Sequence, residues 1–139
     1  MAKKKRMSDI IETVGQALVN AKAAKLNKIG APEINLTQFQ YISVINQNQD
    51  LSFTGLAQAL NLSKPAVTSI VNKLIEQDYV YKKQSDCDRR VFHIYLTEAG
   101  KQVAEAYEDS RQEYVDGIHR RLTDSEFDRL LELMEKALH

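Results

Sequence analysis

The sequence of 139 residues lacks several features that define other classes of protein. Its single cysteine, Cys87, excludes an intramolecular disulfide framework and a cysteine-rich zinc site. It has no apolar run long enough to span a membrane and no signal-peptide core behind its basic N-terminus, so we expect a cytoplasmic protein with no membrane partner. It also lacks a glycine-rich phosphate loop, paired carboxylates in an apolar setting and a nucleophile beside a base. We therefore expect neither an enzyme nor a cofactor.

Net charge is absent as well, because 19 Lys and Arg balance 19 Asp and Glu. The charge is nevertheless unevenly distributed along the chain. Residues 1–97 carry 13 basic and 8 acidic side chains, a difference of +5, whereas residues 98–139 carry 6 and 11, a difference of −5. This division predicts one lobe that faces an anionic partner and an acidic lobe used for assembly.

The stretch around which the chain is organised is residues 56–74, whose pattern predicts a helix-turn-helix. Apolar residues at helical spacing define two short helices, and Asn61 lies at the turn, where it tolerates a left-handed backbone. Ser63 is placed to cap the second helix, and Pro65 lies in its first turn, where a missing N–H is tolerated. The inward stripe of this second helix comprises Val67, Ile70, Val71 and Leu74.

The opposite face of the second helix is short, polar and free of acidic residues. Hydroxyl and amide groups on such a face can reach base edges in the major groove of DNA, and lysines can reach phosphates. The alternative is an ordinary helical hairpin with a solvated face. This face, here called the recognition face, comprises Lys64, Pro65, Ala66, Thr68, Ser69, Asn72 and Lys73.

A β-hairpin is predicted directly after this helix. Residues 79–83 are rich in strand formers, residues 84–90 are a polar tip, and residues 91–96 alternate between apolar and polar side chains. A hairpin behind a recognition helix is a wing. A helical hairpin without a DNA partner would not need one.

Further helices are predicted on both sides of this winged unit. The first begins at the cap Ser8 and ends near residue 27, and the second begins with a capping box formed by Thr37 and Gln40. After the hairpin, Thr97 caps a long polar helix that ends near residue 121. A last helix with a dense apolar stripe begins with a capping box of Thr123 and Glu126.

These elements predict a mainly α fold with a small β-hairpin wing (α+β), in which terminal helices flank a winged helix-turn-helix. The apolar stripes of the terminal helices need a partner surface, and a second copy of the chain is the simplest one. We expect an N-terminal arm and dimerisation helix in residues 1–35, the winged unit in residues 36–97 and dimerisation helices in residues 98–139.

The order of elements resembles that of the MarR family of winged-helix regulators. Residues 56–68 (LAQALNLSKPAVT) look like the helix-turn-helix of that family. Residues 85–90 (SDCDRR) look like its wing, with an Asp-x-Arg signature, and residues 96–100 (LTEAG) look like the Leu-Thr-x-x-Gly that follows. The element order matches over nearly the whole chain, whereas similarity in residues is mainly confined to residues 52–101.

The resemblance implies that Ser63 and the recognition face enter the major groove of double-stranded DNA. It also implies that Arg90 reaches the adjacent minor groove and that Asp88 holds this arginine by a salt bridge. An arginine on a hairpin tip suits a narrow, electronegative minor groove. Phosphate contacts are implied for Arg89, Lys82 and Lys83.

The resemblance further implies a homodimer on a pseudo-palindromic operator, with recognition helices about 34–36 Å apart. Such a protein would repress transcription until a small-molecule effector shifts the balance between two conformations. Small aromatic or phenolic effectors of the family bind between the lobes. Aromatic residues at positions 39, 41, 107 and 114 could line such a space, but their helical spacing is more typical of a core, so we assign no effector residues.

Two alternatives stay open. The chain could be a winged-helix module that binds protein without sequence-specific DNA binding, although the basic residues of the second helix and wing argue against this. It could also respond to oxidants through Cys87, although redox members of the family carry their cysteine near the N-terminus and two adjacent aspartates disfavour a reactive thiolate. No metal site is expected from His93, His119 and His139, which are far apart in the sequence.

Overall fold

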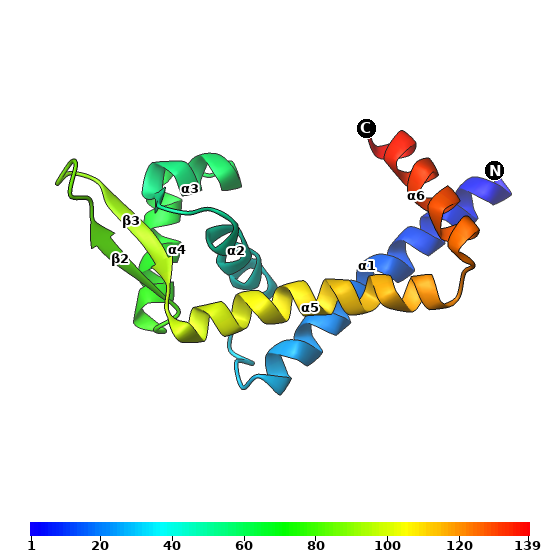
Figure 1. Ribbon diagram of the computed structural model, residues 1–139, viewed down its shortest axis with the longest axis horizontal. Coiled ribbons are helices and arrows are strands. Elements are labelled where there is room, and N and C mark those ends of the chain that lie inside the picture. The colour runs from blue at the N-terminus through cyan, green and yellow to red at the C-terminus, as the bar shows by residue number, and fades with distance from the viewer.

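The computed structural model describes residues 1–139 and consists of six helices and one small sheet. Figure 1 shows an elongated molecule with the β-hairpin at one end and both termini near the other. None of the helices is long and apolar enough to cross a membrane. The elements are α1 (Ala2–Lys28), α2 (Leu36–Gln47), β1 (Leu51–Ser52), α3 (Phe53–Leu60), α4 (Lys64–Glu76), β2 (Val80–Gln84), β3 (Phe92–Leu96), α5 (Glu98–Arg120) and α6 (Asp124–Leu138).

Helices α3 and α4 form the predicted helix-turn-helix. The chain leaves α3 through Asn61, whose φ of 53° and ψ of 46° are left-handed. The side chain of Ser63 then caps α4 by accepting a hydrogen bond from the N–H of Ala66 at 3.3 Å, and Pro65 lies in the first turn. The predicted turn residue, helix cap and first-turn proline are therefore confirmed.

The sheet is antiparallel, with the strand order β1-β3-β2. Strands β2 and β3 form the predicted hairpin, with Val80 opposite Leu96 and Gln84 opposite Phe92. The third strand, β1, was not expected from the sequence. It has only two residues, and its pairing of Leu51 with Ile94 brings together segments more than forty positions apart.

The hydrophobic core lies mainly within the winged unit, includes Leu26 at the end of α1 and extends under the first half of α5. Phe39 and Ile42 from α2 and Leu56 from α3 are fully buried in it. The ring of Phe39 meets that of Tyr107 edge to face, with centroids 4.9 Å apart. The inward stripe of α4 is buried at Val67, Val71 and Leu74, whereas Ile70 is half-buried at its margin.

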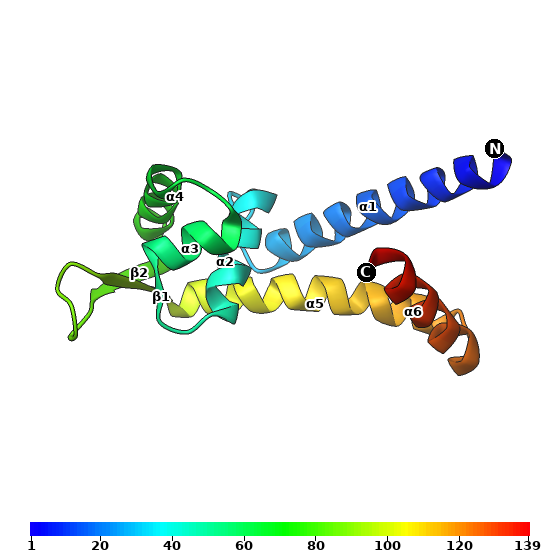
Figure 2. The same cartoon turned by 90° about the horizontal axis from the view of Figure 1, so that it is seen from above.

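A second lobe is built from α1, the far half of α5 and α6. Helices α1 and α5 lie side by side over part of their length and diverge toward the N-terminus (Figure 2). They are joined by an ion pair between Lys25 and Glu113 at 2.6 Å, and the hydrogen bond to this carboxylate raises the pKa of Lys25. Residues 1–13 are exposed along their whole length, and α6 has no buried residue.

Two predicted helix starts are wrong. Helix α1 begins at Ala2 and not at Ser8, because the helical pattern continues through the basic residues that precede the expected cap. Helix α2 is capped by Asn35, whose side chain accepts from the N–H of Gln38 at 2.8 Å, while the Gln38 side chain accepts from the N–H of Asn35. Asn35 competes successfully with Thr37 because both are good caps and asparagine is the stronger one.

Candidate nucleic-acid interface

The recognition face of α4 points away from the core. The side chains of Ser63, Lys64, Pro65, Ser69, Asn72 and Lys73 are exposed, and those of Ala66 and Thr68 are half-buried. The hydroxyl of Thr68 donates to the carbonyl of Lys64 at 3.0 Å, so this hydroxyl already has a partner within the chain. Ser69 and Asn72 have no such partner within the chain. They are therefore the hydroxyl and the amide on this face that are free to bind a ligand.

The tip of the wing is held by local hydrogen bonds. The hydroxyl of Ser85 accepts from the N–H groups of Cys87 and Asp88, and the Gln84 amide donates to the carbonyl of Arg89 at 2.7 Å. These contacts fix the turn that carries the Asp-x-Arg signature. The thiol of Cys87 is exposed on this tip.

Asp88 and Arg90 form the ion pair that the resemblance implies. The guanidinium contacts the carboxylate through Nε at 3.1 Å and Nη2 at 3.2 Å, and the N–H of Arg90 donates to the same carboxylate at 3.0 Å. These hydrogen bonds hold the pKa of Asp88 below its ordinary value. The arginine side chain is still 90% exposed. Its guanidinium is thus oriented and accessible at the same time.

A groove of about 440 Å³ separates the wing from the helix-turn-helix. Three basic side chains line it, Lys64 from α4 with Lys82 and Arg90 from the wing, and no carboxylate does. The ammonium group of Lys82 lies 5.2 Å from the centroid of the Phe92 ring, so the aromatic face helps to position it. The remaining lining residues are Ser52, Phe53, Thr54, Thr68, Val91 and Phe92.

The groove brings together only part of the predicted wing residues. Lys82 and Lys83 are successive strand residues and point to opposite faces of the sheet, so only Lys82 lines the groove. The side chain of Arg89 does not line it either. Conversely, Ser52 and Thr54 were not predicted as groove residues, because the N-cap and first turn of α3 meet the wing only in the folded chain.

The aromatic residues considered for an effector site and the histidines considered for a metal site lie outside the groove. Phe39 is buried against Tyr107 and belongs to the core, and Tyr41 and Tyr114 are half-buried. No three His, Cys, Asp or Glu side chains lie close enough together to hold a metal ion.

Comparison with known proteins finds one family that matches the winged unit and relatives that match most of the chain. A family model described as MarR family matches residues 33–91. The regulator YpoP of Bacillus subtilis is 25% identical over 91% of this chain and 89% of its own length. The transcriptional regulator AdcR of Streptococcus pyogenes is 29% identical over 95% of this chain and 89% of its own length.

Solved structures share the fold. The chain superimposes on Streptococcus pneumoniae FabT in complex with DNA with a TM-score of 0.84, at 19% identity, over 96% of this chain and 94% of that one. For the Staphylococcus aureus MepR–DNA complex the TM-score is 0.76, at 20% identity, over 94% and 96% of the two chains. The matched relatives are regulators and not enzymes. The winged unit of this chain therefore matches the MarR family, and the chain as a whole is similar to transcriptional regulators and shares the winged-helix fold.

Proposed function

We propose that the protein is a homodimeric repressor that binds a pseudo-palindromic operator in double-stranded DNA and is released by a small-molecule effector. The observation that carries this proposal is the groove between α4 and the wing. Lys64, Lys82 and Arg90 line it, and the one carboxylate paired with them, that of Asp88 on Arg90, lies outside the lining. A chain of phosphates is the ligand that such a groove suits best.

In the proposed complex α4 lies in the major groove. Ser69 and Asn72 would contact base edges, because their polar groups have no partner within the chain. Thr68 would present its methyl group, which suits an apolar contact with a thymine methyl. Ser63, Pro65 and Ala66 would allow the helix start to approach the bases closely. Lys64 and Lys73 would contact phosphates.

The wing would contact the adjacent minor groove through Arg90, which Asp88 orients. A narrow minor groove has an enhanced negative potential that attracts an inserted arginine. Lys82 would contact the phosphates between the two grooves. We place Lys83 and Arg89 on phosphates outside the groove, since neither side chain lines it.

The homodimer is supported by the apolar surface that a single chain leaves exposed. Leu131, Leu133 and Met134 of α6 are 45%, 47% and 50% exposed, and no helix of the same chain covers them. We propose that residues 1–35 and 98–139 form the dimer lobe and that residues 36–97 bind DNA. An effector would release the operator if it binds more tightly to a dimer in which the spacing of the two winged units does not match the two half-sites of the operator.

Salt dependence tests the DNA partner directly. Binding to a pool of labelled duplexes is measured at increasing salt concentrations by fluorescence anisotropy. If the dimer makes six or more phosphate contacts, the logarithm of the binding constant should fall with the logarithm of salt concentration with a slope of about −5 or steeper. A protein that binds no duplex at low salt, or whose affinity is independent of salt, would instead favour a winged-helix module with a protein partner.

A further inference from the structure

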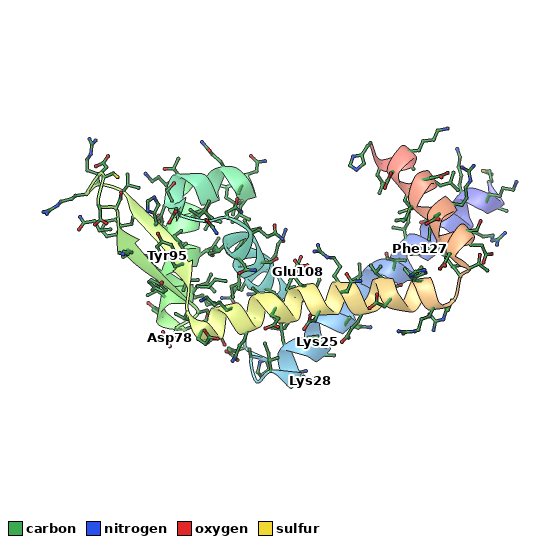
Figure 3. The ribbon with its side chains drawn as sticks, viewed as in Figure 1. Lys25, Lys28, Asp78, Tyr95, Glu108 and Phe127 are labelled. Atoms are coloured by element: carbon green, nitrogen blue, oxygen red, sulfur yellow. The ribbon has the colours of Figure 1, made fainter.

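Two covalent connections join the second lobe to the winged unit. One is helix α5, and the other is the loop of residues 29–35 between α1 and α2. Figure 3 shows Phe127 of the second lobe and Asp78 at the end of α4 far apart along the long axis of the molecule. The orientation of α4 relative to the second lobe must therefore be set by contacts that lie between them.

The loop of residues 29–35 is folded tightly against the end of α1. The N–H of Ala31 donates to the carbonyl of Leu26 at 2.9 Å, and the N–H of Ile34 donates to the carbonyl of Ala31 at 3.2 Å. Ala31 and Ile34 are only 2% and 4% exposed, so the loop is anchored in the core. Because packed interiors transmit displacements, a shift of α1 moves this loop as well.

Two side-chain hydrogen bonds join this region to the end of α4. The hydroxyl of Tyr79 donates to the carboxylate of Glu33. The amide nitrogen of Gln38 donates to the side-chain oxygen of Gln77 at 3.2 Å, while the Gln38 oxygen accepts from the N–H of Asn35. Tyr79 and Gln38 are both buried, so a break in either bond leaves a polar group short of a partner. We call the Tyr79–Glu33 and Gln38–Gln77 bonds the latch.

The same short segment after α4 also holds the start of α5. The hydroxyl of Thr97 donates to the carbonyl of Asp78 at 2.7 Å, and its N–H donates to the carbonyl of Tyr79 at 3.1 Å. Residues 77–79 therefore contact both connections to the second lobe. A change in the relative position of α1 and α5 reaches the end of α4 through these three residues.

We propose that the latch fixes the angle of α4 relative to the second lobe and thereby determines which spacing of operator half-sites the dimer accepts. This inference rests on the proposed function and names Gln77 and Tyr79 as positioning residues, although neither belongs to the recognition face. In a two-fold dimer the latch is present twice, so both α4 helices are held at one separation. A dimer without the latch would accept a wider range of spacings.

Insertion of one base pair between the half-sites measures this property. It moves the half-sites apart by about 3.4 Å and rotates them by about 34–36°. A latched dimer has to break hydrogen bonds to follow both changes, so the insertion should weaken wild-type binding about tenfold or more. The ratio of the two Kd values, here called the insertion penalty, is measured by fluorescence anisotropy on the inverted repeat that the wild type selects from random duplexes.

Gln77→Ala and Tyr79→Phe each remove one hydrogen bond of the latch. One hydrogen bond changes an equilibrium constant by a factor of about 2–10, so each variant should lower the insertion penalty by about twofold or more. The variant that combines both should lower it by about fivefold or more. Gln77→Glu keeps an oxygen that accepts from Gln38 and should retain the penalty of the wild type.

Tyr95→Phe is the matched control, because it also removes a hydroxyl that donates to a carboxylate. Tyr95 donates to Asp50 at 2.7 Å, and both residues belong to the winged unit. Figure 3 shows Tyr95 on the wing sheet, away from Lys28 at the end of α1. This variant should therefore keep the insertion penalty of the wild type.

A duplex with one half-site shows whether α4 itself is intact, and urea unfolding shows whether each variant folds. Tyr79→Phe decides alone if Gln77→Ala does not fold. An unchanged insertion penalty in the latch variants would overturn the proposal. An equal loss of affinity for the single half-site and for both operators would also overturn it, because the residues would then be merely structural. A wild-type protein that prefers two half-sites no more than one would overturn the proposed operator binding itself, and this inference with it.

Discussion

Arg90 differs from the other basic side chains of the wing because its orientation is fixed before any partner binds. Two guanidinium contacts and one backbone contact hold it on Asp88, while most of its surface stays exposed. An oriented side chain loses less conformational freedom on binding than a mobile one. The pair therefore favours insertion of a preorganised arginine, which suits a minor groove better than a mobile lysine would.

Replacing Arg90 should weaken operator binding without unfolding the protein. We expect Arg90→Ala to cost about 1–3 kcal/mol in binding free energy, because a groove contact is lost while the hairpin keeps its pairing. Fluorescence anisotropy measures the affinity, and thermal unfolding measures the stability. The control Lys28→Ala removes an exposed positive charge outside the proposed interface and should bind almost as tightly as wild type. Wild-type affinity in Arg90→Ala would show that the wing does not contact the operator in this way.

Tyr79 makes the stability of the fold depend on pH in alkaline solution. Burial, and a hydrogen bond that its hydroxyl donates to Glu33, raise the pKa of Tyr79 to about 12. The unfolded chain ionises this tyrosine near pH 10, so its contribution to stability is fully present below pH 10 and is lost as the pH rises toward 12.

The free energy of unfolding of the wild type should therefore fall between pH 10 and pH 12 more steeply than that of Tyr79→Phe. Urea unfolding at closely spaced pH values measures both slopes, and the remaining five tyrosines are common to the two proteins. Equal slopes would mean that Tyr79 ionises as readily in the folded protein as in the unfolded chain.

At the scale of elements, the junction between the hairpin and α5 depends on one glycine. Thr97 caps α5 through the N–H of Gly100 at 3.1 Å, and its own N–H donates to the carbonyl of Tyr79. A Cβ at Gly100 would lie 2.0 Å from that carbonyl oxygen. The helix can approach the strand this closely only because position 100 has no side chain, which explains the glycine of the Leu-Thr-x-x-Gly segment.

Gly100→Ala should lower the free energy of unfolding by about 1–3 kcal/mol, because the carbonyl of Tyr79 and the start of α5 must move apart to make room for the methyl group. Gly117→Ala is the control on the same helix, where the nearest atom to an added Cβ lies at 3.8 Å. That substitution should stabilise the helix by about 0.5–1 kcal/mol. Urea denaturation compares the two variants. Similar stabilities would show that the junction can relax around an extra methyl group.

How well the sequence predicts an element depends on how local its signals are. The caps at Ser63, Thr97 and Thr123 were predicted because each needs only the N–H group three residues later. The sequence did not show that Asn35 and not Thr37 caps α2, because both residues are good N-caps. Strand β1 could not be found, since its two residues become a strand only through pairing with distant β3.

The site follows the same principle. Lys64 and Arg90 were found from motifs within single segments, and their outward orientation follows from the buried faces of α4 and the hairpin. The groove between them depends on α3, α4 and the wing together. The contribution of Thr54 and the position of Lys82 over Phe92 therefore required the folded chain.

At the scale of the whole molecule, binding to a pseudo-palindromic operator requires two copies of the chain. Leu131 lies in the middle of the exposed stripe of α6, where a charge would be buried at an interface without a partner. Leu131→Asp should therefore convert the dimer to monomers in sedimentation at micromolar concentration. Ser125→Asp adds the same charge near the start of the helix and should leave the dimer intact. If the Leu131→Asp variant remained dimeric, α6 would not be part of the interface.

The most direct test of the central claim is selection from a pool of random duplexes with the purified protein at physiological salt. A dimer that places two α4 helices in successive major grooves should enrich an inverted repeat whose half-sites are about one helical turn, ~34–36 Å, apart. Enrichment of a single half-site would contradict the proposed dimer on DNA. Retention of no preferred sequence, from a protein shown to be dimeric and folded, would contradict sequence-specific operator binding.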